Sequence, residues 1–141
     1  MKPKIIICVS VILLFFFSGE NSYSQSPPTT WTYTYLKAQP NQRDNLKLFL
    51  EKNWLVMDSI AISQKLIKRY ELQINVSESV EKEWDYIVAV EYYENQPYEV
   101  IADRFNLIRQ NHRTIIVNGF ALKDLGRITK SELVRKGKSS Q

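Results

Sequence analysis

The clearest pattern in the chain is a strict alternation of residues over positions 30–36. Trp31, Tyr33 and Tyr35 fall on one face of an extended segment, and the threonines between them fall on the other. A period of two in residues that favour β-structure predicts a strand. The strand therefore presents one aromatic face and one hydroxyl-bearing face.

Three further segments are predicted strands. Residues 66–76 alternate between apolar and polar positions, and residues 84–93 form a highly apolar stretch, which is typical of a strand buried on both faces. Residues 127–134 form the last strand. Between them, residues 114–123 allow two interpretations: an irregular connection, which we favour, or a tight hairpin with a type I′ turn at Asn118 and Gly119.

Two segments carry apolar residues at helical spacing, residues 42–58 and residues 98–109. Asn41, followed three residues later by Asp44, provides the capping side chain and the early acidic charge of a helix start. Residues 60–64 have mixed signals and are predicted to be a connection. The resulting order, βαββαβ, predicts an α+β domain of ferredoxin-like type, with a four-stranded antiparallel sheet and two helices on one face.

The first 24 residues have the pattern of a secretory signal. Lys2 and Lys4 precede an apolar run over residues 5–17, and the chain then turns polar. That run would span only about 20 Å as a helix, less than the ~30 Å hydrocarbon core of a bilayer. The small residues Ser22 and Ser24 suit signal peptidase, so we place cleavage after Ser24. The alternatives are a retained anchor or a core helix.

Cleavage there predicts a secreted or periplasmic protein without a stable membrane anchor. A proline-containing leader, residues 25–29, precedes the domain at 30–134, and a flexible basic tail follows at 135–141. The whole chain has 141 residues, of which 44% are hydrophobic. This length and composition are typical of one small domain. Its net charge of +4 is modest and scattered, so we expect no nucleic-acid partner.

A sheet with helices on one face leaves its second face uncovered. If Trp31, Tyr33 and Tyr35 lie there, a second copy is expected to cover them, which predicts a homodimer. The element order, with Trp-Asp-Tyr-Ile-Val-Ala-Val-Glu-Tyr on the third strand at 84–92, resembles the dimeric α+β barrel superfamily over residues 30–134. The resemblance implies two sheets paired into one barrel. It is closest to the secreted, uncharacterised branch of a superfamily that also includes cofactor-independent monooxygenases and haem-degrading enzymes.

Few residues qualify for chemistry. His112 is the single histidine and the obvious general base. It is also the only match to the iron-binding histidine on the second helix that a resemblance to the haem-degrading branch would imply. Its place near the end of a helix favours a structural role. Asp85 and Glu91 are weak catalytic candidates whose alternative is structural pairing with Arg or Lys. Aromatic side chains are candidates for lining a ligand cavity, with a core or dimer interface as the alternative: Trp31, Tyr33, Tyr35, Tyr70, Trp84 and Tyr86.

Composition narrows the function further. After cleavage the chain keeps one histidine and loses Cys8, its only cysteine, so we expect no metal site of the zinc type and no cofactor. The glycines form no phosphate-binding loop. The favoured hypothesis is a dimeric binding or structural module for a small apolar ligand held between sheet and helices. The alternative is an enzyme like the cofactor-independent monooxygenases; substrate and physiological role stay open.

Overall fold

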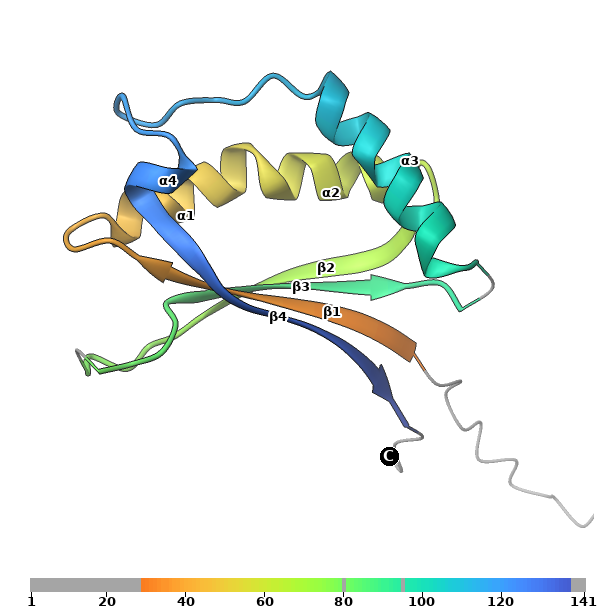
Figure 1. Cartoon of the computed structure of the whole chain (residues 1–141), viewed down its shortest axis with the longest axis horizontal. Coiled ribbons are helices and arrows are strands. Elements are labelled where there is room, and N and C mark those ends of the chain that lie inside the picture. Colours follow the sequence, from red (N-terminus) through yellow and green to blue (C-terminus); the bar gives the residue numbers. More distant parts are fainter. Residues whose placement is uncertain (1–28, 80, 95, 138–141) are drawn as a thin grey trace, which may run out of the picture.

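Four antiparallel strands form one sheet (Figure 1). The computed structural model describes residues 29–79, 81–94 and 96–137. The strands are β1 (Thr29–Ala38), β2 (Ile67–Ile74), β3 (Tyr86–Tyr92) and β4 (Gly126–Lys136), and their order in the sheet is β2-β3-β1-β4. With helices packed on the sheet, this arrangement confirms the predicted α+β, ferredoxin-like fold.

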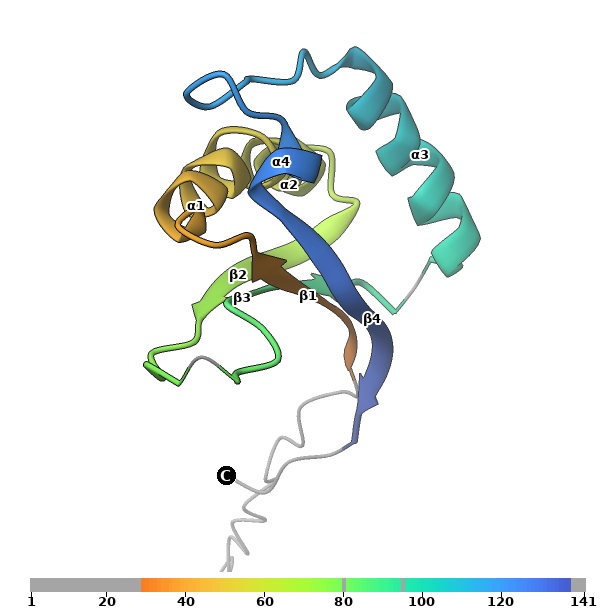
Figure 2. The same ribbon diagram turned by 60° about the vertical axis from the view of Figure 1, so that its left-hand side comes forward.

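The helices lie on one side of the sheet (Figures 1 and 2). They are α1 (Arg43–Lys52), α2 (Trp54–Ser63), α3 (Tyr98–Asn111) and the single turn α4 (Leu122–Leu125). Figure 2 shows α3 to one side, beside α2, rather than directly above β4. This placement matters for function, because α3 does not pack flat against the sheet.

The first predicted helix, 42–58, is broken in two at Asn53. The φ of Asn53 is −117°, far from the helical value of about −63°. Beyond the break the helix continues to Ser63, so the prediction of a connection at 60–64 is wrong. The reason is packing: Ala61 follows Met57 by one turn and is completely buried in the core, which extends the apolar face past Asp58.

The segment 114–123 combines both of its interpretations. Val117 and Phe120 exchange two backbone hydrogen bonds, of 3.1 and 2.8 Å, around Asn118 and Gly119. Both central residues have positive φ, 50° and 83°, as a type I′ turn requires. The pairing stops after this one bridge, so the hairpin turn is present without a hairpin ladder. The sequence pattern did not predict α4.

β4 is longer than predicted at its carboxyl end. Arg135 pairs with Thr30 and Lys136 pairs with Thr29, so two residues of the expected tail belong to the sheet. The predictions of a signal at 1–24, its cleavage after Ser24, most of the leader and the end of the tail at 138–141 lie outside the described residues.

The core lies between the sheet and the helices. Leu36 on β1 is completely buried against Leu46 and Leu50 of α1 and against the inner side chains of β3, Tyr86, Val88 and Val90. Each such side chain contributes about 1.5–3 kcal/mol through burial.

Gly126 occupies the point where α4 meets β4. A Cβ atom there would lie 2.7 Å from Leu46 Cδ2 and 2.7 Å from the Lys37 carbonyl oxygen, so only glycine permits this close approach.

Candidate functional site

A cavity of about 720 Å³ lies between the inner face of the sheet and the helices. This volume is within the range of about 300–1,000 Å³ that is typical of small-molecule sites. Three strands supply the side chains that face it from the sheet. These are Thr32 and Thr34 of β1, Val88, Val90 and Tyr92 of β3, and Ile128 and Ser131 of β4.

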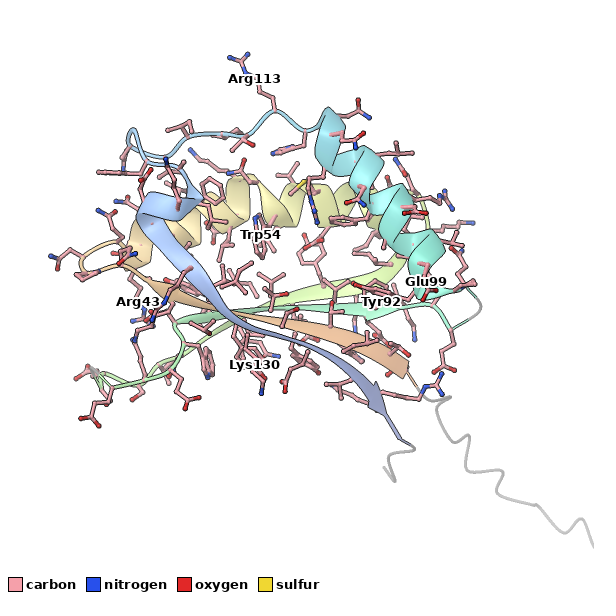
Figure 3. All side chains as sticks on the ribbon, in the orientation of Figure 1. Arg43, Trp54, Tyr92, Glu99, Arg113 and Lys130 are labelled. Carbon is pink, nitrogen blue, oxygen red and sulfur yellow. The ribbon has the colours of Figure 1, made fainter. Side chains whose placement is uncertain are left out.

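Helices α2 and α3 supply most of the opposite wall, with smaller contributions from α1 and α4. On α2, Trp54, Met57 and Asp58 are spaced by three and four residues, which places all three on the face toward the cavity. On α3, Tyr98, Ile101 and Phe105 line it at a spacing of three and four residues. Figure 3 shows Trp54 and Tyr92 in the space between the helical layer and the sheet. The wall is therefore mainly apolar and aromatic.

Asp58 is the buried acidic group of this cavity. Only 4% of its surface is exposed, and its Oδ2 atom has no hydrogen-bond partner among the described residues. Burial raises the pKa of its carboxyl group to about 7, since the charged form loses hydration without gaining a partner. The sequence analysis missed this residue. A signal was present, because Asp58 is the only charged residue in the apolar segment 54–63.

Tyr92 lies close to the acid. Its hydroxyl shares a 3.0 Å hydrogen bond with Thr32 Oγ1. Burial, with a smaller effect from the negative charge of Asp58, raises the pKa of Tyr92 to about 12. The Tyr98 ring meets the Tyr92 ring edge to face, with 5.6 Å between centroids. Tyr92 is therefore an uncharged hydroxyl near neutral pH.

His112 is the only sequence-predicted candidate that lines the cavity. Its Nε2 atom lies 3.1 Å from Asn53 Oδ1, and because an amide oxygen only accepts, Nε2 carries the proton. Asn53 is buried and is bonded to Ile115 as well. This hydrogen bond fixes the imidazole to the cavity wall, and it occupies one of the two ring nitrogens.

Asp85 immediately precedes β3 and does not line the cavity. Lys82 Nζ is 2.9 Å from one carboxylate oxygen, and the Ala38 amide donates to the other at 2.8 Å. Arg43 and Lys37 lie within 3.5 and 4.0 Å. Burial opposes ionisation, but these hydrogen bonds and charges outweigh it and hold the pKa of Asp85 below its usual value.

Glu91 has the same type of environment. Arg69 Nε lies 2.6 Å from one carboxylate oxygen and Lys68 Nζ lies 3.2 Å from the other. Neither Glu91 nor Asp85 lines the cavity. Both acids are thus paired with cations, as their structural interpretation describes.

The six aromatic candidates divide between the two faces of the sheet. Trp31, Tyr33 and Tyr35 lie on the outer face, while Tyr70 and Tyr86 lie on the inner face, where Tyr70 shares a 2.9 Å hydrogen bond with Ser59 of α2. The Tyr86 hydroxyl donates to the Arg43 carbonyl at 3.0 Å, and Trp84 contacts Tyr35 edge to face. None of the six lines this cavity, so the cavity gives no support to their role as ligand-binding residues.

On the outer face, the Trp31 ring is covered by the chain's own charged side chains. Arg69 lies over the Trp31 ring, with 4.9 Å to the centroid, and Lys136 Nζ lies 4.2 Å from the same centroid. Tyr33 stacks beside it at 5.9 Å. Trp31 is therefore 2% exposed in a single copy, which corrects the expectation that this face is bare.

Two further features of the described part of the chain bear on the site. It holds no group of three or more His, Cys, Asp or Glu side chains placed to bind a metal ion. Within the same residues, no helix has the length and hydropathy needed to cross a bilayer.

Comparison of the chain with models of protein families, with curated proteins and with solved structures gives no match. The cavity and its side chains therefore carry the functional argument.

Proposed function

We propose that this protein binds a small, mainly apolar ligand in the cavity between its sheet and its helices. The observation that carries the proposal is a space of about 720 Å³ whose lining exposes more apolar than polar surface, with aromatic and aliphatic side chains from both the sheet and the helices. Native interiors are otherwise close-packed, with few voids larger than a water molecule. A cavity of this size and composition is the usual form of a small-molecule site.

The position of α3 supports the proposal. The helix contacts α2, and its residues Ile101 and Phe105 face the cavity, while Tyr98 reaches the sheet at the Tyr92 ring. Leu107 on the same helix is 58% exposed and faces solvent. The apolar inner face of α3 is thus only partly used by the chain, and a bound ligand would complete its burial.

The proposal is tested with Nile red, an uncharged apolar dye whose emission rises on leaving water. Ala102 on α3 lines the cavity, so Ala102→Trp fills it and is expected to weaken dye binding at least about tenfold. Val100→Trp adds the same ring on the exposed side of α3 and serves as the control. Equal dye affinity of both variants and the parent would contradict the proposal.

We further propose that the protein is exported and belongs to the dimeric α+β barrel superfamily. Support comes from the ferredoxin-like strand order and from an outer sheet face that no helix covers. Tyr33 and Tyr35 remain partly exposed on that face. Dimer formation there would have to retain the cations that already cover Trp31. Export is checked by mass spectrometry of the exported protein, which should begin at Gln25.

A second candidate function is an enzyme of the cofactor-independent monooxygenase type. The observation that favours it is the presence of Asp58 and His112 in the wall of one apolar cavity, since a buried acid with a pKa near neutrality suits proton transfer. The bond between His112 and Asn53 counts against it. Oxygen consumption with an electron-rich phenol, lost in Asp58→Asn, would favour the enzyme over the binding module.

A further inference from the structure

We infer that the ligand of this cavity carries one ammonium group, and that the Asp58 carboxylate pairs with it. The inference rests on the proposed function, because it specifies the chemistry of the ligand that the cavity would bind. Three observations lead to it: the missing partner of Asp58, the aromatic rings around it, and the position of the basic side chains.

The first observation is a contrast among buried acids. Three buried carboxylates occur in the described residues, Asp58, Asp85 and Glu91. Asp85 and Glu91 each contact at least two Lys or Arg side chains within 4.0 Å. Asp58 takes part in no salt bridge with a described residue, and its Oδ2 atom has no hydrogen-bond donor. Since buried carboxylates are ordinarily paired, the partner of Asp58 is expected to come from the ligand.

The second observation is the aromatic lining of the same cavity. Trp54 precedes Asp58 by one helical turn, and Tyr92 lies near enough for the charge of Asp58 to affect it. Tyr98 and Phe105 add two more rings from α3. The faces of such rings attract cations within about 6 Å, and rings combined with a carboxylate are a common means of ammonium recognition. Figure 3 shows how Trp54 from α2 and Tyr92 from β3 approach this space from opposite sides.

The third observation concerns the other charged side chains of the lining. They are Arg109, His112 and Lys123; Arg109 and Lys123 are exposed, and His112 is bonded to Asn53. Tyr92 and Tyr98 complete the titratable groups of the wall. None of these side chains forms a salt bridge with Asp58. The cations would repel a second positive charge on the ligand, which favours a monoamine with an apolar body over a polyamine.

The inference is tested by calorimetric titration with two ligands of nearly equal shape, 2-phenylethylammonium and the uncharged 2-phenylethanol. At pH 8, above the pKa of Asp58, the ammonium compound is expected to bind at least about tenfold more tightly than the alcohol. Asp58→Asn keeps the shape of the side chain and should remove this preference, with little change in the affinity for the alcohol. Asp103→Asn, on the exposed side of α3, removes the same charge and should keep the preference.

The outcomes separate the inference from the function on which it rests. Equal affinity of the parent protein for both ligands overturns the ammonium inference and leaves the apolar-ligand proposal standing. Binding of neither ligand overturns both. A measurement on the parent at pH 5 needs no variant, because protonation of Asp58 should abolish the preference; an unchanged preference at pH 5 also overturns the inference. A His112→Gln variant repeats this measurement at both pH values without the histidine in the cavity wall.

Discussion

The Asn53 side chain holds the backbone of Ile115 through both of its polar atoms. Asn53 Oδ1 accepts from the Ile115 amide at 2.7 Å, and Nδ2 donates to the Ile115 carbonyl at 3.0 Å. The same Nδ2 donates to the Phe49 carbonyl, and Oδ1 accepts from His112. One buried amide thus joins the break between α1 and α2 to the chain that leaves α3, and it fixes that part of the cavity wall.

Removing this amide should destabilise the fold strongly. Asn53→Ala leaves the amide and the carbonyl of Ile115 without these partners, while the Phe49 carbonyl keeps its bond from the backbone amide of residue 53, so the free energy of unfolding should fall by about 1–3 kcal/mol. Asn45→Ala is the control, because Asn45 bonds only to side chains near the surface and should lose less than about 1 kcal/mol. Urea denaturation measures both. Similar losses in the two variants would show that Asn53 has no special role.

The pKa of Asp58 makes stability depend on pH in a defined direction. Its folded value of about 7 exceeds the ordinary value of 3.8, so the folded state binds the proton more tightly than the unfolded state. The resulting stability is complete below about pH 4 and is lost as the pH rises to about 7, by an amount on the order of 4 kcal/mol. Asp58→Asn should remove that loss and be more stable than the parent at pH 8, with little difference at pH 4. Parallel stability profiles from pH 4 to 8 would contradict this.

Asp85 should act in the opposite direction. Its folded pKa is lowered, so its contribution is present above the ordinary value of 3.8 and is lost as the pH falls through the folded value. Asp85→Asn at pH 7 leaves Lys82 and Arg43 without their carboxylate and should cost about 2–3 kcal/mol, at the low end for a buried pair because Arg43 is partly exposed. Asp103→Asn should be nearly neutral. The comparison is made by thermal unfolding at pH 7, and equal effects would show that the pairing of Asp85 is unimportant.

Two glycines offer a matched steric test. Gly126→Ala would place a Cβ atom 2.7 Å from Leu46 Cδ2 and from the Lys37 carbonyl, so it should cost more than about 2 kcal/mol. Gly137→Ala meets nothing within 4 Å and should change the unfolding free energy by less than about 0.5 kcal/mol. Denaturant titration of both variants measures the difference. A tolerated Gly126→Ala would mean that Leu46 and the Lys37 carbonyl can move away from Gly126 without cost.

The proposed dimer has a simple test on the outer sheet face. Tyr33→Glu would bury a charge at the interface and should convert a dimer into monomer or aggregate. Leu107→Glu changes an exposed apolar residue of α3 and should leave the mass unchanged. Size-exclusion chromatography with light scattering measures the molecular mass of both variants. A monomeric parent protein would refute the dimer, although the cavity of the single chain would remain.

The sequence predicted most of the architecture because local periodicity determines it. Alternation located β1 and β2, and the apolar run located β3, since each pattern reflects which side of the sheet is buried. The break at Asn53 was not predictable, because it depends on a partner 62 residues away, at Ile115. The turn at Asn118 and Gly119 carried its own local signal.

The site was harder to predict than the fold. Aromatic residues stand out in a sequence, and the six chosen as ligand candidates serve the core and the outer face instead. In the sequence, Asp58 is only an isolated acid in an apolar segment. Its place in a cavity wall depends on the position of α3, which the sequence pattern does not give. Arg69 and Lys136 cover the Trp31 ring only because of the strand register, which places Arg69 opposite Glu91 and Lys136 opposite Thr29. A sequence pattern does not reveal this register.

The three tryptophans occupy three different surroundings, and this makes them built-in optical probes. Trp31 is covered by two cations on one side of the sheet, Trp54 belongs to the cavity lining on the other side, and Trp84 precedes β3 beside Tyr35. An added quencher such as acrylamide should therefore leave Trp31 almost untouched. In single-tryptophan variants, the fluorescence of Trp54 would report changes in the cavity, and that of Trp31 would report changes on the outer sheet face.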